Sequence, residues 1–110
     1  MANKYLRKYV TPSATTETTL YTVPASNTSI LSSLRITNRN ANTALLDVYV
    51  YPVGGATAYR MLKSYTLPSS STMDAFSGVP LILEATDIVK IKASVADVDF
   101  YLSFLEMDRN

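Results

Sequence analysis

The side chains that could perform covalent chemistry in this sequence are serines, lysines and carboxylates, because it contains no cysteine and no histidine. Nucleophilic catalysis needs an activated hydroxyl beside a base. Ser64 follows Lys63 directly, but neighbouring residues of a strand point to opposite faces of the sheet. The serines of "PSSSTMD" lie in a turn-like stretch, where hydroxyls usually bond to nearby backbone. We therefore expect no catalytic residue and no enzymatic activity.

The carboxylates raise the possibility of glycoside hydrolysis or cation binding. In "ADVDF", Asp97 and Asp99 are two residues apart and would share one face of a strand. Calcium loops combine several acids with glycine or asparagine, and no segment here does so. We interpret the two aspartates as a solvent-facing strand opposite Lys90 and Lys92. No metal site and no cofactor is expected, and thiolate or histidine zinc sites are excluded by composition.

Tyrosine is the third candidate, as a binding rather than a reacting group. Tyr49 and Tyr51 belong to one strand-like run, and Tyr59 and Tyr65 belong to the next. If both sets face the same side, they form a contiguous patch. Tyrosine combines a large contact area with a polar tip, which suits interfaces and sugar stacking. Three interpretations stay open: a protein interface, a glycan-binding platform, or one half of the core.

The N-terminal segment 1–13 is basic and contains no acid. We interpret it as an arm that either remains solvated or docks on an acidic neighbouring subunit. Without a partner we expect it to be poorly ordered through about Ser13. The residues that it would offer to an interface are Lys4, Tyr5, Arg7, Lys8 and Tyr9.

Polar and apolar residues alternate with period two through most of the chain, which indicates strands. "ALLDVYVYPV" and "TAYRMLKSYTLP" flank "VGGA", whose paired glycines predict a hairpin. "LILEATDIVKIKAS" reads as strand, turn at 84–87, and strand, and "VDFYLSFLEM" as a final strand. Around 73–76 the pattern allows a brief strand or, in "STMDAFSG", one turn of helix. Together these signals predict an all-β protein: a compact, jelly-roll-like antiparallel sandwich of seven to nine strands within residues 14–110.

The composition excludes several partners. A net charge of +1 gives no long-range field for nucleic acid or membrane surfaces. No apolar run reaches the roughly 20 residues of a membrane helix, and "MANKYLRKYV" lacks the apolar core of a signal peptide. We expect synthesis in a cytoplasm. Charged residues make up only 17% of the chain, which suits a surface partly covered by neighbours.

The order of the strand motifs carries a resemblance. "TTLYTVPASNTSILSSLRITNRNANTALLDVYVY" and the later "LILEATDIVKIKASVADVDFYLSFLEM" resemble the two halves of small virion structural proteins of tailed bacteriophages. The similarity covers about residues 18–107. It rests on a "TLYTVPA" run and turn, an "ITN" strand, a valine-rich strand, and the closing strands.

The resemblance implies a protein that decorates or cements a capsid, or that builds part of a neck, tail or baseplate. Such a protein is made in the host cytoplasm and resides in the virion. It would bind capsid or tail subunits and copies of itself, often as a trimer. The alternative function, argued from the tyrosines alone, is a carbohydrate-binding module.

Overall fold

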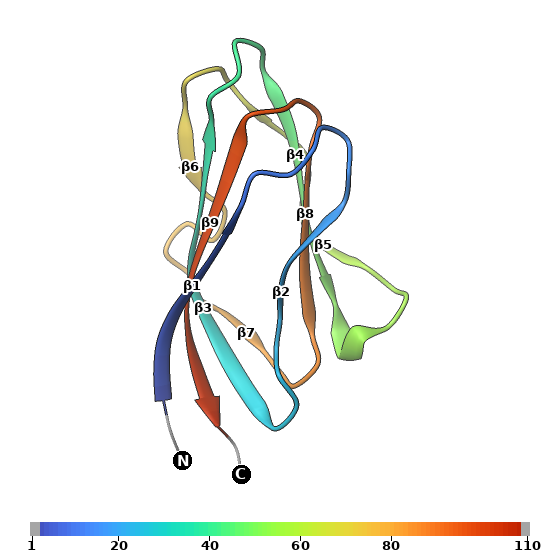
Figure 1. Ribbon diagram of the computed structural model, residues 1–110, viewed down its shortest axis with the longest axis vertical. Coiled ribbons are helices and arrows are strands. Elements are labelled where there is room, and N and C mark those ends of the chain that lie inside the picture. Colours follow the sequence, from blue (N-terminus) through green and yellow to red (C-terminus); the bar gives the residue numbers. More distant parts are fainter. Residues whose placement is uncertain (1–2, 109–110) are drawn as a thin grey trace.

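The computed structural model describes residues 3–108 as two antiparallel β-sheets packed face to face, in a body of 46 × 27 × 21 Å. The elements are β1 (Asn3–Val10), β2 (Thr18–Thr22), β3 (Asn27–Asn38), β4 (Ala44–Tyr51), the short 3-10 turn η1 (Pro52–Gly54), β5 (Tyr59–Leu67), β6 (Thr72–Asp74), β7 (Leu81–Leu83), β8 (Ile88–Ala93) and β9 (Val98–Asp108). This confirms the predicted all-β sandwich, with nine strands in the described part of the chain (Figure 1).

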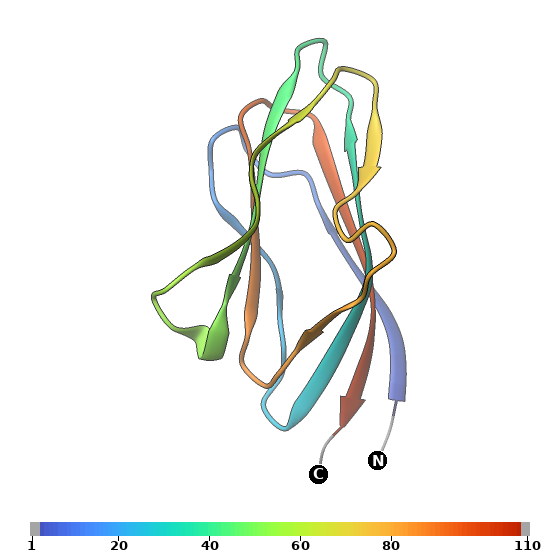
Figure 2. The same ribbon diagram turned by 180° about the vertical axis from the view of Figure 1, so that it is seen from behind.

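One sheet, here sheet A, has the order β1-β9-β3, and β6 and β7 both pair with the far side of β3. The other, sheet B, has the order β2-β8-β4-β5. Sheet A therefore ends in β1 on one side and in β6 and β7 on the other. The β4–β5 hairpin projects beyond the sandwich at one edge of sheet B (Figure 2).

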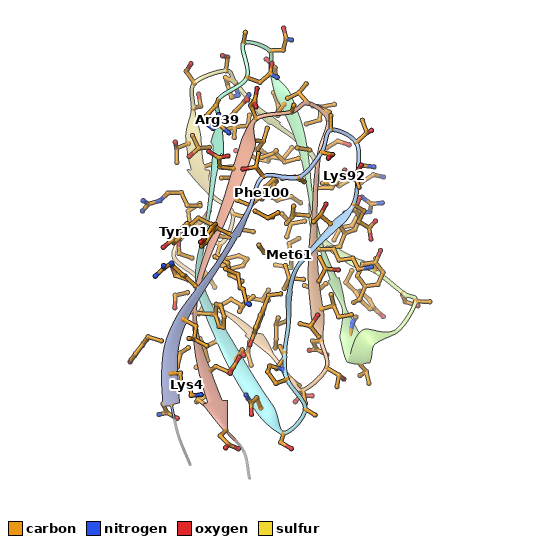
Figure 3. The ribbon with its side chains drawn as sticks, in the orientation of Figure 1. Lys4, Arg39, Met61, Lys92, Phe100 and Tyr101 are labelled. Carbon is orange, nitrogen blue, oxygen red and sulfur yellow. The ribbon has the colours of Figure 1, made fainter. Side chains whose placement is uncertain are left out.

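The alternation seen in the sequence becomes the core. Along β9, Phe100 and Leu102 are fully buried between the sheets, while Tyr101 between them is exposed on the outer side (Figure 3). Leu34 of β3 and Val48 of β4 contribute equally buried side chains from the two layers. Branched and aromatic side chains pack well on pleated surfaces, so the same residues that favour strands also fill the interior.

Buried polar side chains fasten the loops at the ends of the sandwich. The fully buried Asn38 donates from Nδ2 to the carbonyls of Asn42 and Leu67, and its Oδ1 accepts from the Asn40 amide. Asp87 accepts the amides of Val53 and Glu84 at 2.8 and 2.9 Å, which joins η1 to the 84–87 turn. Burying such groups costs little when they are hydrogen-bonded.

Two local expectations about Asp97 and Asp99 need correction. Asp97 and Asp99 do not pair with Lys90 and Lys92, because the chain crosses between β8 and β9 from sheet B to sheet A. Asp97 lies in that connection with φ of 62°, outside the strand. The hairpin at "VGGA" is confirmed, but the left-handed residue in it is Val53 rather than Gly55.

Around 73–76 the brief-strand alternative is the one found, and in the N-terminal segment the structure has a strand where an arm was expected. Residues 72–74 form the strand β6, and no helix follows them within 75–80. The basic segment 1–13 contains the strand β1, which pairs with β9 along its whole length, from Asn3 opposite Met107 to Val10 opposite Phe100. Buried and exposed residues do not alternate in β1, because this strand lies at the edge of the sheet and both of its faces are exposed.

Candidate interaction surface

The strand β1 presents the basic and aromatic residues that the sequence singled out. Tyr5, Arg7 and Tyr9 share the outer face of sheet A, since they stand opposite Leu105, Ser103 and Tyr101. The alternate residues, including Lys4 and Lys8, face the side of the core but remain exposed, because β1 lies at the sheet edge. Tyr5 is 87% exposed.

Two cross-strand rows run over the outer face of sheet A from one edge to the other. The first joins Tyr5, Leu105, Ile30 and Ile82, from β1 to β7. Directly paired residues of antiparallel strands lie on the same face, so these side chains form one apolar band. Ile82 at its far end is 66% exposed.

The second row joins Tyr9, Tyr101, Arg35 and Asp74, from β1 to β6. The rings of Tyr9 and Tyr101 stack with centroids 5.9 Å apart and an interplanar angle of 12°. The Arg7 guanidinium lies 6.0 Å from the Tyr9 ring centroid. The outer face of sheet A thus combines apolar, aromatic and cationic groups, a mixture typical of protein interfaces.

Several hollows of the surface lie along β1. One of about 560 Å³ is lined chiefly by Tyr5, Arg7, Tyr9 and Ser103. A second of about 450 Å³ opens between β1 and β2, the facing edge strands of the two sheets. A third of about 330 Å³ borders the end of β1, between β1 and β9. The hollows are shallow and open, and their polar groups do not converge on one point.

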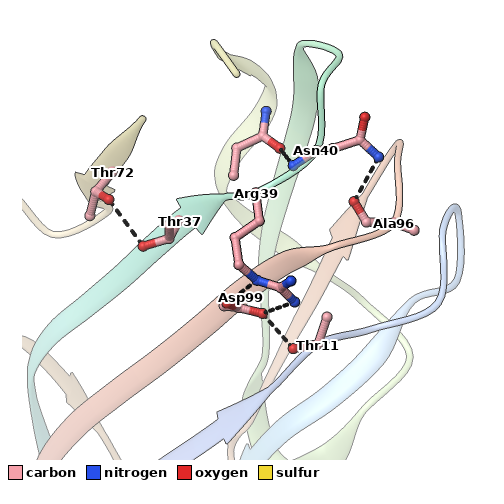
Figure 4. A network of polar contacts seen from close by, with 8 residues as sticks. Thr11, Thr37, Arg39, Asn40, Thr72, Ala96 and Asp99 are labelled. Atoms are coloured by element: carbon pink, nitrogen blue, oxygen red, sulfur yellow. Dashed lines mark hydrogen bonds and ion pairs between the residues drawn. The ribbon is translucent and has the colours of Figure 1, made fainter. Parts of the chain in front are cut away.

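The top end of the same face is fixed by an ion pair (Figure 4). Arg39 donates from Nε and Nη2 to the two carboxylate oxygens of Asp99 at 2.7 and 3.0 Å, and the Thr11 hydroxyl donates to Asp99 at 2.6 Å. The Arg39 guanidinium, followed by Thr11, holds the pKa of Asp99 below its usual range. This bidentate pair joins the β3 end, β9 and the segment after β1.

The hairpin tyrosines are divided between the two faces of sheet B. Tyr49 stands opposite Arg60, whereas Tyr59 and Tyr65 stand opposite the inward-facing Val50 and Leu46. Tyr49 is only 3% exposed, with the Arg60 guanidinium 4.7 Å from its ring centroid. The contiguous four-tyrosine patch is therefore not formed.

Two further carboxylates hold the fold together. Asp47 accepts the Ser64 amide at 2.8 Å and an Arg60 contact at 3.3 Å. Asp74 accepts the amides of Leu34 and Phe76. Their oxygens are occupied by backbone groups rather than aimed at a common space. Within residues 3–108 no three metal-binding side chains are grouped.

One buried titratable group lies inside the sandwich. The Tyr21 phenol bonds to the Ser29 hydroxyl at 2.6 Å and donates to Glu106 at 2.7 Å, with its ring 4.2 Å from that of Phe104. Burial, supported by the carboxylate, raises the pKa of Tyr21 above its ordinary value. Among the described residues no buried polar side-chain atom lacks a partner, and this cluster is a structural contact between β2, β3 and β9.

Reasoning from sequence found some of these surface residues and missed others. Strand parity placed Tyr101 and Leu105 together on the outward side of the last strand. Parity failed for Ile30, which shares it with the buried Leu34 and Ile36, because a bulge between Leu31 and Ser33 shifts the register of β3. Among the described helical segments, none is long and apolar enough to cross a membrane.

The sequence matches no family model, and no curated protein matches it. Solved structures nevertheless share its fold. A chain from the crystal structure of the T13 IBDV viral particle gives a TM-score of 0.59 at 12% identity, covering 94% of this chain and 30% of that one. A chain from the infectious bursal disease virus VP2 subviral particle gives 0.53 at 12% identity, covering 94% and 32%.

A third similar chain comes from Bacillus endospore appendages, described as a novel family of disulfide-linked pili. Its TM-score is 0.60 at 14% identity, covering 99% of this chain and 88% of that one. The present chain spans about a third of the viral chains and most of the appendage chain. What these proteins share with it is the β-sandwich fold.

Proposed function

We propose that this protein is a structural component of a virion that binds neighbouring subunits of the particle, and specifically a capsid decoration or cement protein. The observation that carries the proposal is the outer side of sheet A. There apolar, aromatic and cationic side chains lie exposed in ordered rows next to an unpaired strand edge.

The chemistry of the described residues fits adhesion without turnover. Four of the acids, Asp47, Asp74, Asp87 and Asp99, hold backbone amides or an ion pair. The hollows along β1 are open and shallow, as expected of contact surfaces rather than reaction clefts. Such a protein would stay on its particle because detachment must break many weak contacts at the same time.

The fold supports the same role at the level of architecture, since chains of a viral particle and of a pilus use it. The sequence resemblance to small virion proteins of tailed bacteriophages makes a phage head the first expected location. A neck, tail or baseplate location is the alternative. The structure of a single chain is compatible with each.

A carbohydrate-binding module remains the second candidate, carried by the exposed rings of Tyr59 and Tyr65 on the projecting hairpin. Calorimetric titration with host surface polysaccharide distinguishes it. Binding lost in Tyr59→Ala and Tyr65→Ala, but kept in Tyr5→Ala, would favour the module over the virion role.

Mass spectrometry of purified particles after lysine cross-linking tests the leading proposal. We expect the protein in the particle, with Lys4 and Lys8 of β1 linked to capsid subunits. Lys92 of β8, on sheet B, is the internal control and should link less often. Absence from the particle would overturn the proposal, and links to tail subunits alone would change the location to the tail.

A further inference from the structure

The two edges of sheet A carry opposite charge. The chain from 1 to 16, which includes β1, contains Lys4, Arg7 and Lys8 and no acid. The chain from 64 to 89, which includes β6 and β7, contains no base, and two of its acids, Asp74 and Glu84, lie at the end of β6 and directly after β7. Within residues 3–108, none of the side chains that carry these charges has an ion-pair partner within 4 Å. They are Lys4, Arg7 and Lys8 on the β1 side, and Asp74 and Glu84 on the β6 and β7 side.

Both edges also have unpaired backbone. The strands β1 and β7 are each hydrogen-bonded on one side only, so an extended segment can add to either of them. Three antiparallel steps separate β1 from β7, through β9 and β3, so the two edges run in opposite directions. A second copy placed beside the sheet would therefore bring its β1 antiparallel to β7.

We propose that copies of this protein join head to tail through sheet A, with β1 of one copy adding to the β7 edge of the next. The inference goes beyond the virion role and does not depend on it. In the register that continues the first row, Tyr5 lies beside Ile82 of the neighbouring copy. These are the most exposed members of the row.

The remaining pairs of this register are also compatible. Leu6 lies opposite Leu81 and Lys4 opposite Leu83, all on the core-facing side, and Glu84 follows Leu83 directly, opposite Asn3. Pro80, which has no amide hydrogen, ends the ladder. Beyond it, Tyr9 of the neighbouring copy continues the second row toward Asp74, and Arg7 lies two residues from Tyr9 on the same face. Within residues 3–108 the Asp74 carboxylate has only neutral donors.

A symmetric pairing of two β1 strands is disfavoured by the same charges. The two most complete registers that keep the faces aligned place Lys4 opposite Lys8 or Arg7 opposite Arg7. Like charges directly opposite one another destabilise a strand pair. The head-to-tail contact is heterologous, so successive copies form a ring if the rotation between them closes and a filament if it does not.

Charge exchange tests the interface in the isolated protein. Sedimentation velocity at low salt should show concentration-dependent association of the unaltered chain. Lys4→Glu and Glu84→Lys should each weaken it by roughly tenfold or more, because each leaves like charges one residue apart across the new strand pair. An equimolar mixture of the two variants should associate again, since each contact then has one acid and one base. A chain that stays monomeric at all concentrations, or a mixture that does not associate, would overturn the proposal.

Disulfide trapping tests the register. The chain has no cysteine, so a Tyr5→Cys, Ile82→Cys double variant contains only the two introduced thiols. Within one chain these positions are three strands apart, about 14 Å, too far for a disulfide. Oxidation should therefore give a ladder of linked copies. The matched control, Tyr9→Cys with Ile82→Cys, should remain mostly unlinked, and equal ladders from both variants would contradict the register.

Discussion

At the scale of single residues, the structure assigns charged side chains to holding loops rather than to reacting. Asp99 is the clearest case, because one carboxylate is bound by Arg39 from the end of β3 and by Thr11 from the segment after β1. Its pKa is lowered first by the Arg39 hydrogen bonds. A group with a lowered pKa in the folded state contributes stability above its unfolded pKa and loses it as the pH falls.

The stability of the protein should therefore decrease in acid partly through Asp99. The contribution should be complete above about pH 4, the ordinary aspartate range, and should disappear as the pH falls through the lowered pKa. Urea unfolding at a series of pH values measures it. Asp99→Asn should reduce the decrease of the free energy of unfolding in acid. Asp97→Asn should leave that decrease unchanged, because the ion pair between Arg39 and Asp99 is kept. Equal pH dependence in Asp99→Asn and the unaltered chain would contradict this assignment.

At the scale of elements, the strands could be predicted because polar and apolar residues alternate in step with exposure and burial. The partners of each strand could not, since nothing local in residues 88–105 states that β8 and β9 belong to different sheets. The tyrosine patch failed for a related reason. The β4–β5 register places odd-numbered residues opposite even-numbered ones at both ends, so Tyr65 stands opposite Leu46 and Tyr59 opposite Val50. A one-residue offset moves every side chain of a strand to the other face.

The hairpin turn stores backbone strain that a substitution can release. Val53 is β-branched, 76% exposed and has φ of 56°, although glycines follow it. Val53→Gly should raise the free energy of unfolding by about 1 kcal/mol, and its amide bond to Asp87 should remain. Val79→Gly is the control, because Val79 is a similarly exposed valine without a positive φ. A loss of stability in Val53→Gly would show that the turn is unstrained.

The strand β1 is the element whose order should depend most on a partner. It pairs with β9 alone, and the segment 11–17 that follows it has no regular structure. Local opening is easiest where few buried contacts oppose it. Dilute free protein should be trimmed by protease back to "TPSATTETT", with the rest intact. Full resistance of a verified monomer would contradict this expectation.

At the scale of the whole molecule, the faces and edges of the sandwich differ in the residues that they expose. One side of sheet A has ordered apolar and aromatic rows, its two edges differ in charge, and sheet B ends in a projecting hairpin. The sequence predicted the β-sandwich and the basic residues of β1. It could not predict the rows, because they exist only once four strands are in register. Function on this view belongs to surfaces that residues from distant parts of the chain build together.

Hydrogen–deuterium exchange of the protein within purified particles, compared with the free monomer, tests most directly that the working surface is the β1 side of sheet A. The amides of Asn3–Val10 should exchange at least roughly tenfold more slowly in the particle, because the open edge becomes paired or covered. The other long edge strand, β5 at Tyr59–Leu67, should change little. Unchanged exchange in β1, or slowing confined to β5, would contradict the account.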